Sequence, residues 1–279
     1  MKLELKDYPV KDAICFGKLV TFDIAMDTFP DKRMRTIRVY LPESYDGVKR
    51  FPVMYMHDAQ NLFTGAGVDE FKWYVDRVMR DLEPTGIQVI FVGIDTSDDR
   101  GSELFPPYTQ NATHRIPHRP GTPEPTAMGH YYADFVKNTL KPLIDENFMT
   151  LPDAANTCIG GASGGGCASY YMVMRDPEVF GRAFVYSPGF PLLDMEKIMQ
   201  MLDEYDMSRL ADVRIAFYNG DQAIDVTSVD DVLTVYRKHR ELGMDPEHLM
   251  FLFDSRQTHS NVAWNKYMPE VLRFLFLGK

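Results

Sequence analysis

The sequence has few cysteines and no long apolar run, and both shortages exclude classes of protein. Only Cys15, Cys158 and Cys167 occur in 279 residues, with no CxxC spacing. We interpret Cys158 and Cys167 as small buried hydrophobes rather than as parts of a disulfide framework or a metal site. No segment offers the ~20 apolar residues of a membrane span, and the first residues do not resemble a signal peptide. We therefore expect a cytoplasmic protein that is not in the membrane.

Basic residues are also scarce. The chain has 30 Lys and Arg against 40 Asp and Glu, which gives a formal net charge of −10. This balance argues against nucleic acid or an anionic membrane surface as the main partner. Hydrophobic residues make up 45% of the chain, enough to bury a core. The sequence has no internal repeat and no low-complexity linker, so we expect a single domain over residues 1–279.

Apolar runs alternate with helical patterns along most of the chain. Residues 19–26 and 35–41 alternate polar and apolar positions around a turn-like DTFPDKR, which predicts an antiparallel hairpin. Nearly continuous apolar runs predict strands buried on both faces at 51–57, 88–95, 156–160, 182–187, 213–218 and 249–253. Helical patterns lie between them, at 70–82, 131–148, 165–175, 229–242 and 263–276. These elements predict an α/β fold with a mostly parallel sheet, helices on both faces and the hairpin at one edge.

One segment, residues 100–129, fits neither pattern. It is rich in proline and polar residues and follows the predicted strand 88–95. A long loop in a compact domain is often a lid or a binding loop, and we expect that role here. His114 and His118 are four residues apart, but Pro117 disfavours a continuous helix between them, so we expect no metal site.

A serine lies in the glycine-rich stretch CIGGASGGG. Residues 161–165 match G-x-S-x-G between a predicted strand and a predicted helix, with Ser163 at the centre. A sharp strand-to-helix turn holds such a serine clear of the sheet and requires small neighbours. The pattern predicts a nucleophile elbow rather than a phosphate-binding loop, because GxxxxGK[ST] is absent.

A serine nucleophile needs a histidine base and an acid, in the chain order Ser, Asp or Glu, His. His239 lies in the charged stretch VYRKHREL, where we expect a solvated face, and His248 precedes a strand at the far end of the sheet. His259 follows the last predicted strand, at the same end as Ser163, and is our candidate base.

The acid is expected after the predicted strand 213–218, where NGDQAID offers two candidates. Asp221 directly follows the glycine at the strand's end and is preferred, with Asp225 as the alternative. Asp212 precedes its strand and Asp254 is too close to the base, so we discount both.

Acyl transfer also needs two backbone N–H donors for the oxyanion. One should belong to Gly164, the residue after the nucleophile. The other should come from HDAQNLF after the strand 51–57, from Gln60 or alternatively from Ala59. The side chains of His57 and Asp58 can instead cap the end of that strand.

Taken together, these segments resemble the "putative esterase" family of α/β-hydrolases, which includes feruloyl and acetyl-xylan esterases, enterochelin-type esterases, S-formylglutathione hydrolases and mycolyltransferases. The resemblance covers nearly the whole chain, with HDAQN where HDGQN is usual, GGASGGG where GGSSMGG is usual, and the closing segments PEVFGRAFVYSP and THSNVAWNKYMPEVLRFLF. It implies an α/β-hydrolase fold with Ser163 as nucleophile and His259 as base. Relatives often place the acid two or three positions after a glycine, whereas Asp221 follows Gly220 directly. This difference keeps Asp225 as an alternative.

We therefore expect a serine carboxylesterase that needs no metal or organic cofactor and acts on a small-molecule ester. A carbohydrate-linked acetyl or feruloyl ester is the favoured substrate. Asp58, Arg115, Arg119 and Trp264 are the expected substrate-binding residues. The alternatives are an enterochelin-type siderophore esterase, an acyltransferase, and a non-catalytic binding protein with a hydrolase fold.

Overall fold

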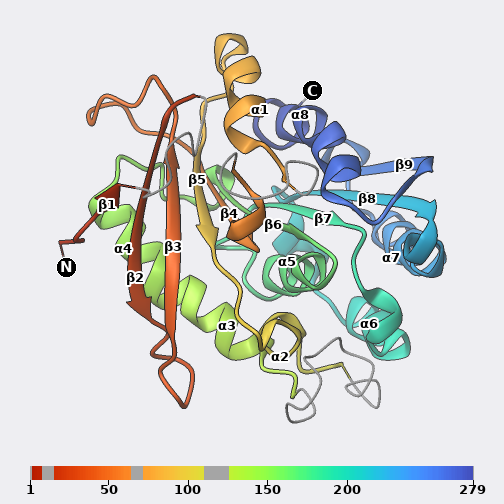
Figure 1. Ribbon diagram of the computed structural model, residues 1–279. Coiled ribbons are helices and arrows are strands. Elements are labelled where there is room, and N and C mark those ends of the chain that lie inside the picture. The colour runs from red at the N-terminus through yellow and green to blue at the C-terminus, as the bar shows by residue number, and fades with distance from the viewer. Residues whose placement is uncertain (1, 8–15, 64–71, 110–125, 279) are drawn as a thin grey trace.

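The computed structural model describes residues 2–7, 16–63, 72–109 and 126–278. Within these ranges a nine-stranded sheet runs through the middle of the protein, in the order β1-β2-β3-β5-β4-β6-β7-β8-β9 (Figure 1). Its strands are β1 (Lys6–Asp7), β2 (Lys18–Ala25), β3 (Met34–Leu41), β4 (Val53–His57), β5 (Ile90–Ile94), β6 (Thr157–Ala162), β7 (Arg182–Tyr186), β8 (Arg214–Gln222) and β9 (Leu249–Thr258).

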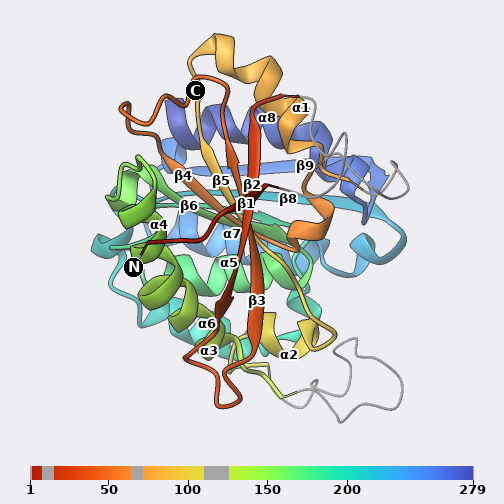
Figure 2. The same cartoon turned by 60° about the vertical axis from the view of Figure 1, so that its left-hand side comes forward.

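The sheet is parallel from β5 to β9 and antiparallel at its N-terminal edge. β2 and β3 form a hairpin, and β3 pairs antiparallel with β5. Figure 2 brings this hairpin to the front, with the short β1 beside it. The prediction of a mostly parallel sheet with an N-terminal hairpin at one edge is confirmed.

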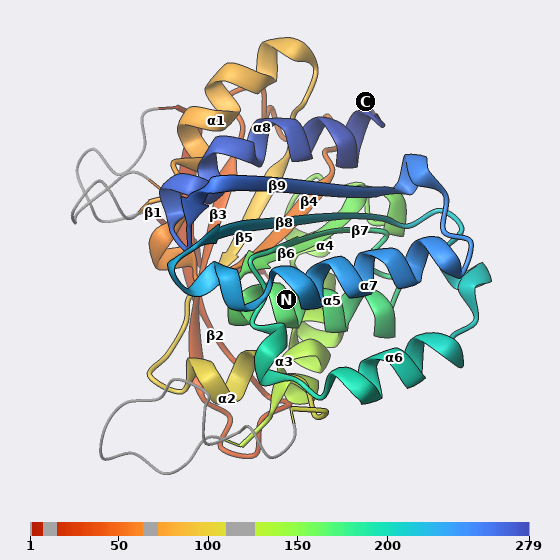
Figure 3. The same ribbon diagram turned by 90° about the vertical axis from the view of Figure 1, so that its right-hand side faces the viewer.

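Helices cover both faces of the sheet. Those described are α1 (Val75–Leu82), α2 (Arg100–Leu104), α3 (Gly129–Phe135), α4 (Lys141–Asn147), α5 (Gly164–Arg175), α6 (Met195–Asp203), α7 (Val229–Glu241) and α8 (Asn261–Leu277). Figure 3 shows α1 and α8 on one side of the sheet, and α5, α6 and α7 on the other. None of the helices in the described ranges combines the length and apolarity needed to span a membrane.

The alternation of side chains along a strand explains the continuous apolar runs. In β4, Val53 and Tyr55 belong to the apolar cluster under α3, α5 and α7, whereas Met54 and Met56 belong to the cluster under α1 and α8. All four are buried. Because successive side chains point to opposite faces, a strand covered on both sides must be apolar at every position.

The described elements match the predicted ones with several differences: β1 and α2 were not predicted, and α1 begins at Val75 rather than at residue 70. β8 and β9 run several residues beyond their predicted ends, to Gln222 and Thr258. The predicted helix 131–148 is interrupted by a π-helical segment, Val136–Leu140, between α3 and α4. α6 was not predicted.

The predicted loop 100–129 is structured where the structure describes it. Its first residues form α2, which packs against α3 and α5, and Leu104, Phe105 and Tyr108 are buried. The backbone N–H of Gly129 donates to the carbonyl of Phe105 at 2.9 Å, which joins the two ends of the segment. Three large apolar side chains make this stretch part of the core, and the expectation of an irregular segment is wrong for residues 100–104, which form α2. Residues 110–125 lie outside the described part of the chain.

Candidate active site

The carboxyl ends of the parallel strands meet at one edge of the sheet, and a cavity of about 370 Å³ lies there. We call it the polar cavity. It is lined by His57, Asp58, Asn61, Trp73, Thr96, Arg100, Ala162, Ser163, His259, Ser260, Asn261 and Trp264. These residues are the last ones of β4 and β6 or come from segments that follow β4, β5, β6 and β9. The edge is therefore the place where side chains distant in sequence converge, as is usual for open α/β sheets.

Ser163 lies in a strained turn between β6 and α5. Its φ of 60° and ψ of −125° are unusual for a residue with a side chain. Its backbone N–H donates to the carbonyl of Tyr186 at 2.9 Å, which ties the turn to β7. A Cβ at Gly161 would lie 2.8 Å from His57 Cδ2, and one at Gly166 would lie 2.9 Å from the Tyr186 carbonyl oxygen. Glycine is required at these two positions because other residues of the protein approach the backbone too closely for a Cβ atom to fit.

Strain recurs at two neighbouring strand ends. Asp58 follows β4 with a φ of 58°, and Ser187 follows β7 with a φ of 37°. Together with Ser163, they place three residues of left-handed φ at one edge of the sheet. Such backbone conformations cost of order 1–3 kcal/mol each, and they cluster at functional sites.

His259 pairs with Asp225. Its Nδ1 lies 2.6 Å from Asp225 Oδ1, and the carboxylate is buried, with 1% of its side chain exposed. Asp221, the preferred candidate, does not make this contact, because its carboxylate accepts from Gln222 Nε2 instead. β8 continues through Asp221 to Gln222, and only then does the 3₁₀ helix Ala223–Thr227 turn the chain back toward His259.

A chain of hydrogen bonds holds Asp225 from behind. Trp264 Nε1 donates to Ser187 Oγ at 3.0 Å, and Ser187 Oγ donates to Asp225 Oδ2 at 2.9 Å. The N–H of Gly220 also donates to Oδ2, at 3.3 Å. Trp264 was expected to contact substrate, and it does line the polar cavity. It also donates to Ser187 within the protein, and its ring lies edge-on to that of His259, with 4.9 Å between centroids. Ser187 was missed, because nothing marks it in sequence beyond its place at a strand end.

Asp58, another expected substrate-binding residue, forms an ion pair within the protein. Arg100 Nε and Nη2 donate to its two carboxylate oxygens at 2.5 and 2.8 Å. Burial lowers the pKa of Arg100, but the charge and hydrogen bonds of Asp58 offset this and leave the pKa above its ordinary value. Arg100 was not singled out from the sequence, although it lies at the start of the segment expected to cover the site.

The expected oxyanion donors come one or two residues after Ser163 and Asp58, which line the polar cavity. Gly164 is the first residue of α5, so its N–H has no acceptor within the helix. Ala59 and Gln60 lie in a 3₁₀ turn directly after Asp58. The amide side chain of Gln60 exchanges two hydrogen bonds with the backbone of Thr96, at 2.8 and 2.9 Å, and so joins this turn to the end of β5.

His57 is buried beneath the serine turn. Its Nδ1 is 2.7 Å from the Tyr132 hydroxyl, and its Nε2 is 3.2 Å from Ser169 Oγ on α5. Burial lowers the pKa of His57 to about 4, so the ring is neutral at pH 7. It lines the polar cavity as a neutral ring and links β4 to α3 and α5.

Among the described residues, the other acids and histidines weighed in the sequence analysis lie away from Ser163 or are paired with other groups. His239 is buried and its Nε2 lies 3.0 Å from the Tyr170 hydroxyl, so the expectation of a solvated face is wrong. His248 and Asp212 precede β9 and β8, at the far end of the sheet, as expected. Asp254 accepts from Lys266 at 2.6 Å and from Tyr267. The expected binding residues Arg115 and Arg119, together with His114, His118 and Cys15, lie outside the described residues.

A second cavity, of about 180 Å³, shares Ser163, His259 and Arg100 with the polar cavity. We call it the apolar cavity. Its other lining residues are Phe105, Ser187, Pro188, Gly189, Pro191, Leu192, Ile224, Asp225, Thr227 and Ser228. The serine and the histidine therefore lie where the two cavities meet.

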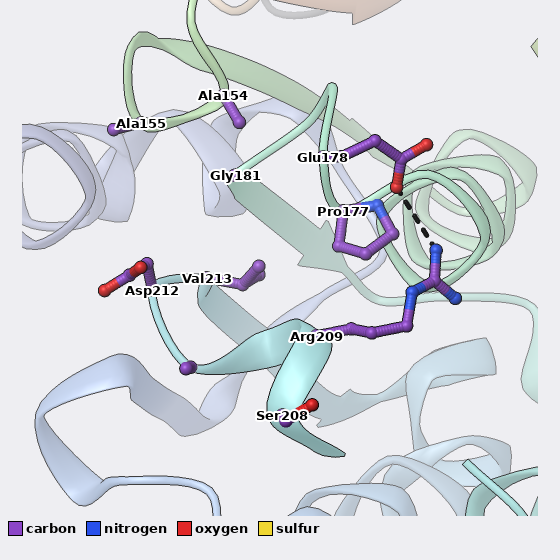
Figure 4. Close-up of a pocket in the computed structure, with 10 residues that line it drawn as sticks. Ala154, Ala155, Pro177, Glu178, Gly181, Ser208, Arg209, Asp212 and Val213 are labelled. Carbon is purple, nitrogen blue, oxygen red and sulfur yellow. Dashed lines mark hydrogen bonds and ion pairs between the residues drawn. The ribbon is translucent and has the colours of Figure 1, made fainter. Parts of the chain in front are cut away.

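A further cavity, of about 310 Å³, lies beside the amino ends of β7 and β8 (Figure 4). Figure 4 shows the ion pair of Arg209 and Glu178 on its wall. Its one lining serine, Ser208, donates its hydroxyl to Asp206, and no histidine or cysteine lines it. Among the described cavities, those at Ser163 are therefore the candidates for chemistry.

The chain is similar to known proteins over most of its length. Residues 31–275 match a family model described as "Putative esterase". The "Uncharacterized protein YbbA" of Bacillus subtilis (strain 168) is 26% identical over 149 residues, which cover 53% of this chain and 54% of that protein. The match therefore spans about half the length of this curated relative.

Solved structures share the fold at low identity. A ferulic acid esterase superposes with a TM-score of 0.66 at 18% identity, covering 95% of this chain and 99% of that one. The ferric enterobactin esterase of Salmonella typhimurium superposes with a TM-score of 0.69 at 13% identity, covering 96% and 60%. At these identities the likeness establishes an α/β-hydrolase type of fold.

Proposed function

The chain belongs to the "Putative esterase" family, and on this premise we propose that it is a serine carboxylesterase with Ser163, His259 and Asp225 as its triad. The observation that carries the proposal is the 2.6 Å contact between His259 Nδ1 and a buried carboxylate, at the edge where Ser163 is held in a strained turn. A histidine oriented in this way by an acid is what a serine nucleophile requires.

In the proposed reaction, Ser163 Oγ attacks the carbonyl carbon of the ester while His259 Nε2 takes its proton. The resulting imidazolium is stabilised by Asp225 and gives the proton to the departing alcohol, which leaves an acyl group on Ser163. Water then attacks the acyl carbon, again with His259 as base, and releases the carboxylic acid. Ser163 recovers its proton and the cycle closes without another reactant.

The oxyanion is proposed to accept from the N–H of Gly164 and from that of Gln60, with Ala59 as the alternative. Support comes from the turn Ala59–Asn61, which Gln60 ties to Thr96 and which follows the fixed Asp58–Arg100 pair. Donors held in place before reaction stabilise developing charge at little cost of reorganisation.

For the substrate, we infer a carbohydrate-linked acyl ester, acetyl or feruloyl. The polar cavity supports it, because Trp73 and Trp264 stack at 5.5 Å beside the polar side chains of Asn61 and Thr96. A siderophore ester is the alternative, favoured by the likeness to the enterobactin esterase. Contacts of Arg115 and Arg119 with the leaving group stay a proposal, as does a cytoplasmic location, which the free thiols of Cys158 and Cys167 support.

The test is labelling by a fluorophosphonate probe, followed by kcat/KM on esters of sugars and of a catecholate trilactone. Labelling that is lost in Ser163→Ala and strongly reduced in His259→Ala is the expected result. A protein that binds sugar esters but neither reacts with the probe nor hydrolyses any of them is the non-catalytic alternative. Products that carry an added alcohol in place of water indicate acyl transfer.

A further inference from the structure

The two cavities at Ser163 differ in what they offer a ligand. In the apolar cavity, Phe105, Pro188, Pro191, Leu192 and Ile224 supply hydrocarbon surface. Phe105 is almost fully buried, and the two prolines have little conformational freedom. Hydrocarbon walls of this kind favour an apolar group.

The hydroxyl groups of the apolar cavity, other than that of Ser163, are occupied within the protein. Ser187 donates to Asp225, Thr227 donates to the carbonyl of Ile224 at 2.8 Å, and Ser228 donates to Asn219 Oδ1 at 3.0 Å. A hydrogen-bond acceptor of the ligand placed against these three hydroxyls would lose its hydrogen bonds to water without replacing them, which costs roughly 1–3 kcal/mol for each group.

The polar cavity offers the opposite. Thr96 Oγ1 is buried and has no hydrogen-bond partner among the described residues. A buried hydroxyl without a partner is unfavourable unless a ligand supplies one. The cavity also has twice the volume of the apolar one, about 370 against 180 Å³.

The volume of the apolar cavity sets the size of the group it can take. An apolar protein cavity of about 150 Å³ is large enough to bind benzene. At about 180 Å³, this cavity holds one six-membered ring, whereas an acetyl methyl would leave most of it empty. An unfilled apolar space loses the contacts that a larger group would make.

We propose that the apolar cavity binds the acyl group of the ester and selects one with a single ring, or an alkyl chain of equal size, over acetyl. The alcohol occupies the polar cavity, where Thr96 Oγ1 bonds one of its hydroxyls. This inference rests on the proposed esterase function. It distinguishes between acetyl and feruloyl, the two acyl groups that the proposed function allows.

The test uses p-nitrophenyl acetate, hexanoate and benzoate, with each kcat/KM divided by the ester's own rate of alkaline hydrolysis. We expect this normalised value to favour benzoate over acetate by at least tenfold. Ile224→Trp and Leu192→Trp, which reduce the cavity, should each lower the benzoate-to-acetate ratio by at least tenfold. Val226 is as exposed as Ile224 on the same 3₁₀ helix but does not line either cavity, so Val226→Trp is the matched control and should keep the ratio within twofold.

A second arm tests the alcohol side with a sugar benzoate and methyl benzoate. Thr96→Val keeps the shape of the side chain and should lower the preference for the sugar ester about threefold, without changing the acyl ratio. A preference for acetate would overturn the assignment of the two cavities but not the esterase function. The same holds if the tryptophan variants alter the preference for the sugar ester instead of the benzoate-to-acetate ratio. Absence of hydrolysis above the Ser163→Ala background for every ester would overturn the esterase function and this inference with it.

Discussion

Replacement of Asp225 by asparagine should abolish most of the activity for a reason visible in its hydrogen bonds. Asp225 Oδ2 accepts from Ser187 Oγ and from the Gly220 N–H, and Oδ1 faces His259 Nδ1. In Asp225→Asn the amide oxygen would stay with the two donors, because an NH₂ group there would meet donors only. The NH₂ group then faces His259.

An NH₂ group at His259 Nδ1 selects the wrong tautomer. Nδ1 must become an acceptor, and the ring proton moves to Nε2, which can then no longer take the proton of Ser163. The loss of a triad aspartate in this way costs on the order of 10⁴ in kcat, or about 5 kcal/mol of barrier. We expect that loss for Asp225→Asn.

The assay is kcat on a p-nitrophenyl ester, with circular dichroism to check that the variant is folded. Asp221→Asn is the matched control, since its carboxylate is partly exposed and accepts from Gln222, and it should lose less than tenfold. Adding Ser187→Ala to Asp225→Asn removes one of the two donors that orient the amide, so part of the lost activity should return. A larger loss in Asp221→Asn than in Asp225→Asn would refute the assignment of the acid.

Three further predictions follow from the site and the core. Ser163→Ala should fold normally and lose at least three orders of magnitude in kcat, and a variant that kept a tenth of the activity would exclude Ser163 as nucleophile. Arg100→Lys and Asp58→Asn should each lower kcat about tenfold, but together no further, in a double-mutant cycle, because each removes the same two-point hydrogen bond between Arg100 and Asp58. Burial lowers the pKa of His239 to about 4, whereas in the unfolded chain it stays at about 6.5. Between these values the unfolded state binds more protons, so the unfolding free energy decreases as the pH is lowered. Between pH 7 and pH 5 this histidine should account for about 2 kcal/mol of lost unfolding free energy in urea titrations, and His239→Gln should remove that share of the pH dependence.

The main elements of the site follow from local sequence patterns. The elbow at Ser163 was predictable because only glycine tolerates the close approach of His57 and of the Tyr186 carbonyl. His259 was predictable because it follows the last strand at the carboxyl edge. These inferences depend on the order of the strands along the chain and on steric requirements. The first is visible as a series of apolar runs, and the second as glycines around the serine.

The position of His239 was misread although its signal is present. Val232, Val235 and His239 are spaced by three and four residues, and all three are buried on α7. The flanking Arg237, Lys238 and Arg240 suggested a solvated face, but charge beside a residue says nothing of the face it occupies. Helical spacing was the better guide.

The choice between Asp221 and Asp225 depended on whether the strand ends at Gly220. A glycine after an apolar run is typical of a strand end, and on that interpretation the next residue begins the catalytic loop. In the structure Gly220 allows pairing to continue instead, since a Cβ there would lie 2.4 Å from the carbonyl oxygen of Gln257 on β9. Asn219 Nδ2 then donates to the carbonyl of Asp225 at 3.0 Å and holds the returning 3₁₀ turn. Because the contact of Gly220 with Gln257 joins β8 to a strand about 35 residues later, no local pattern could have revealed that the carboxylate beside His259 lies one turn further on.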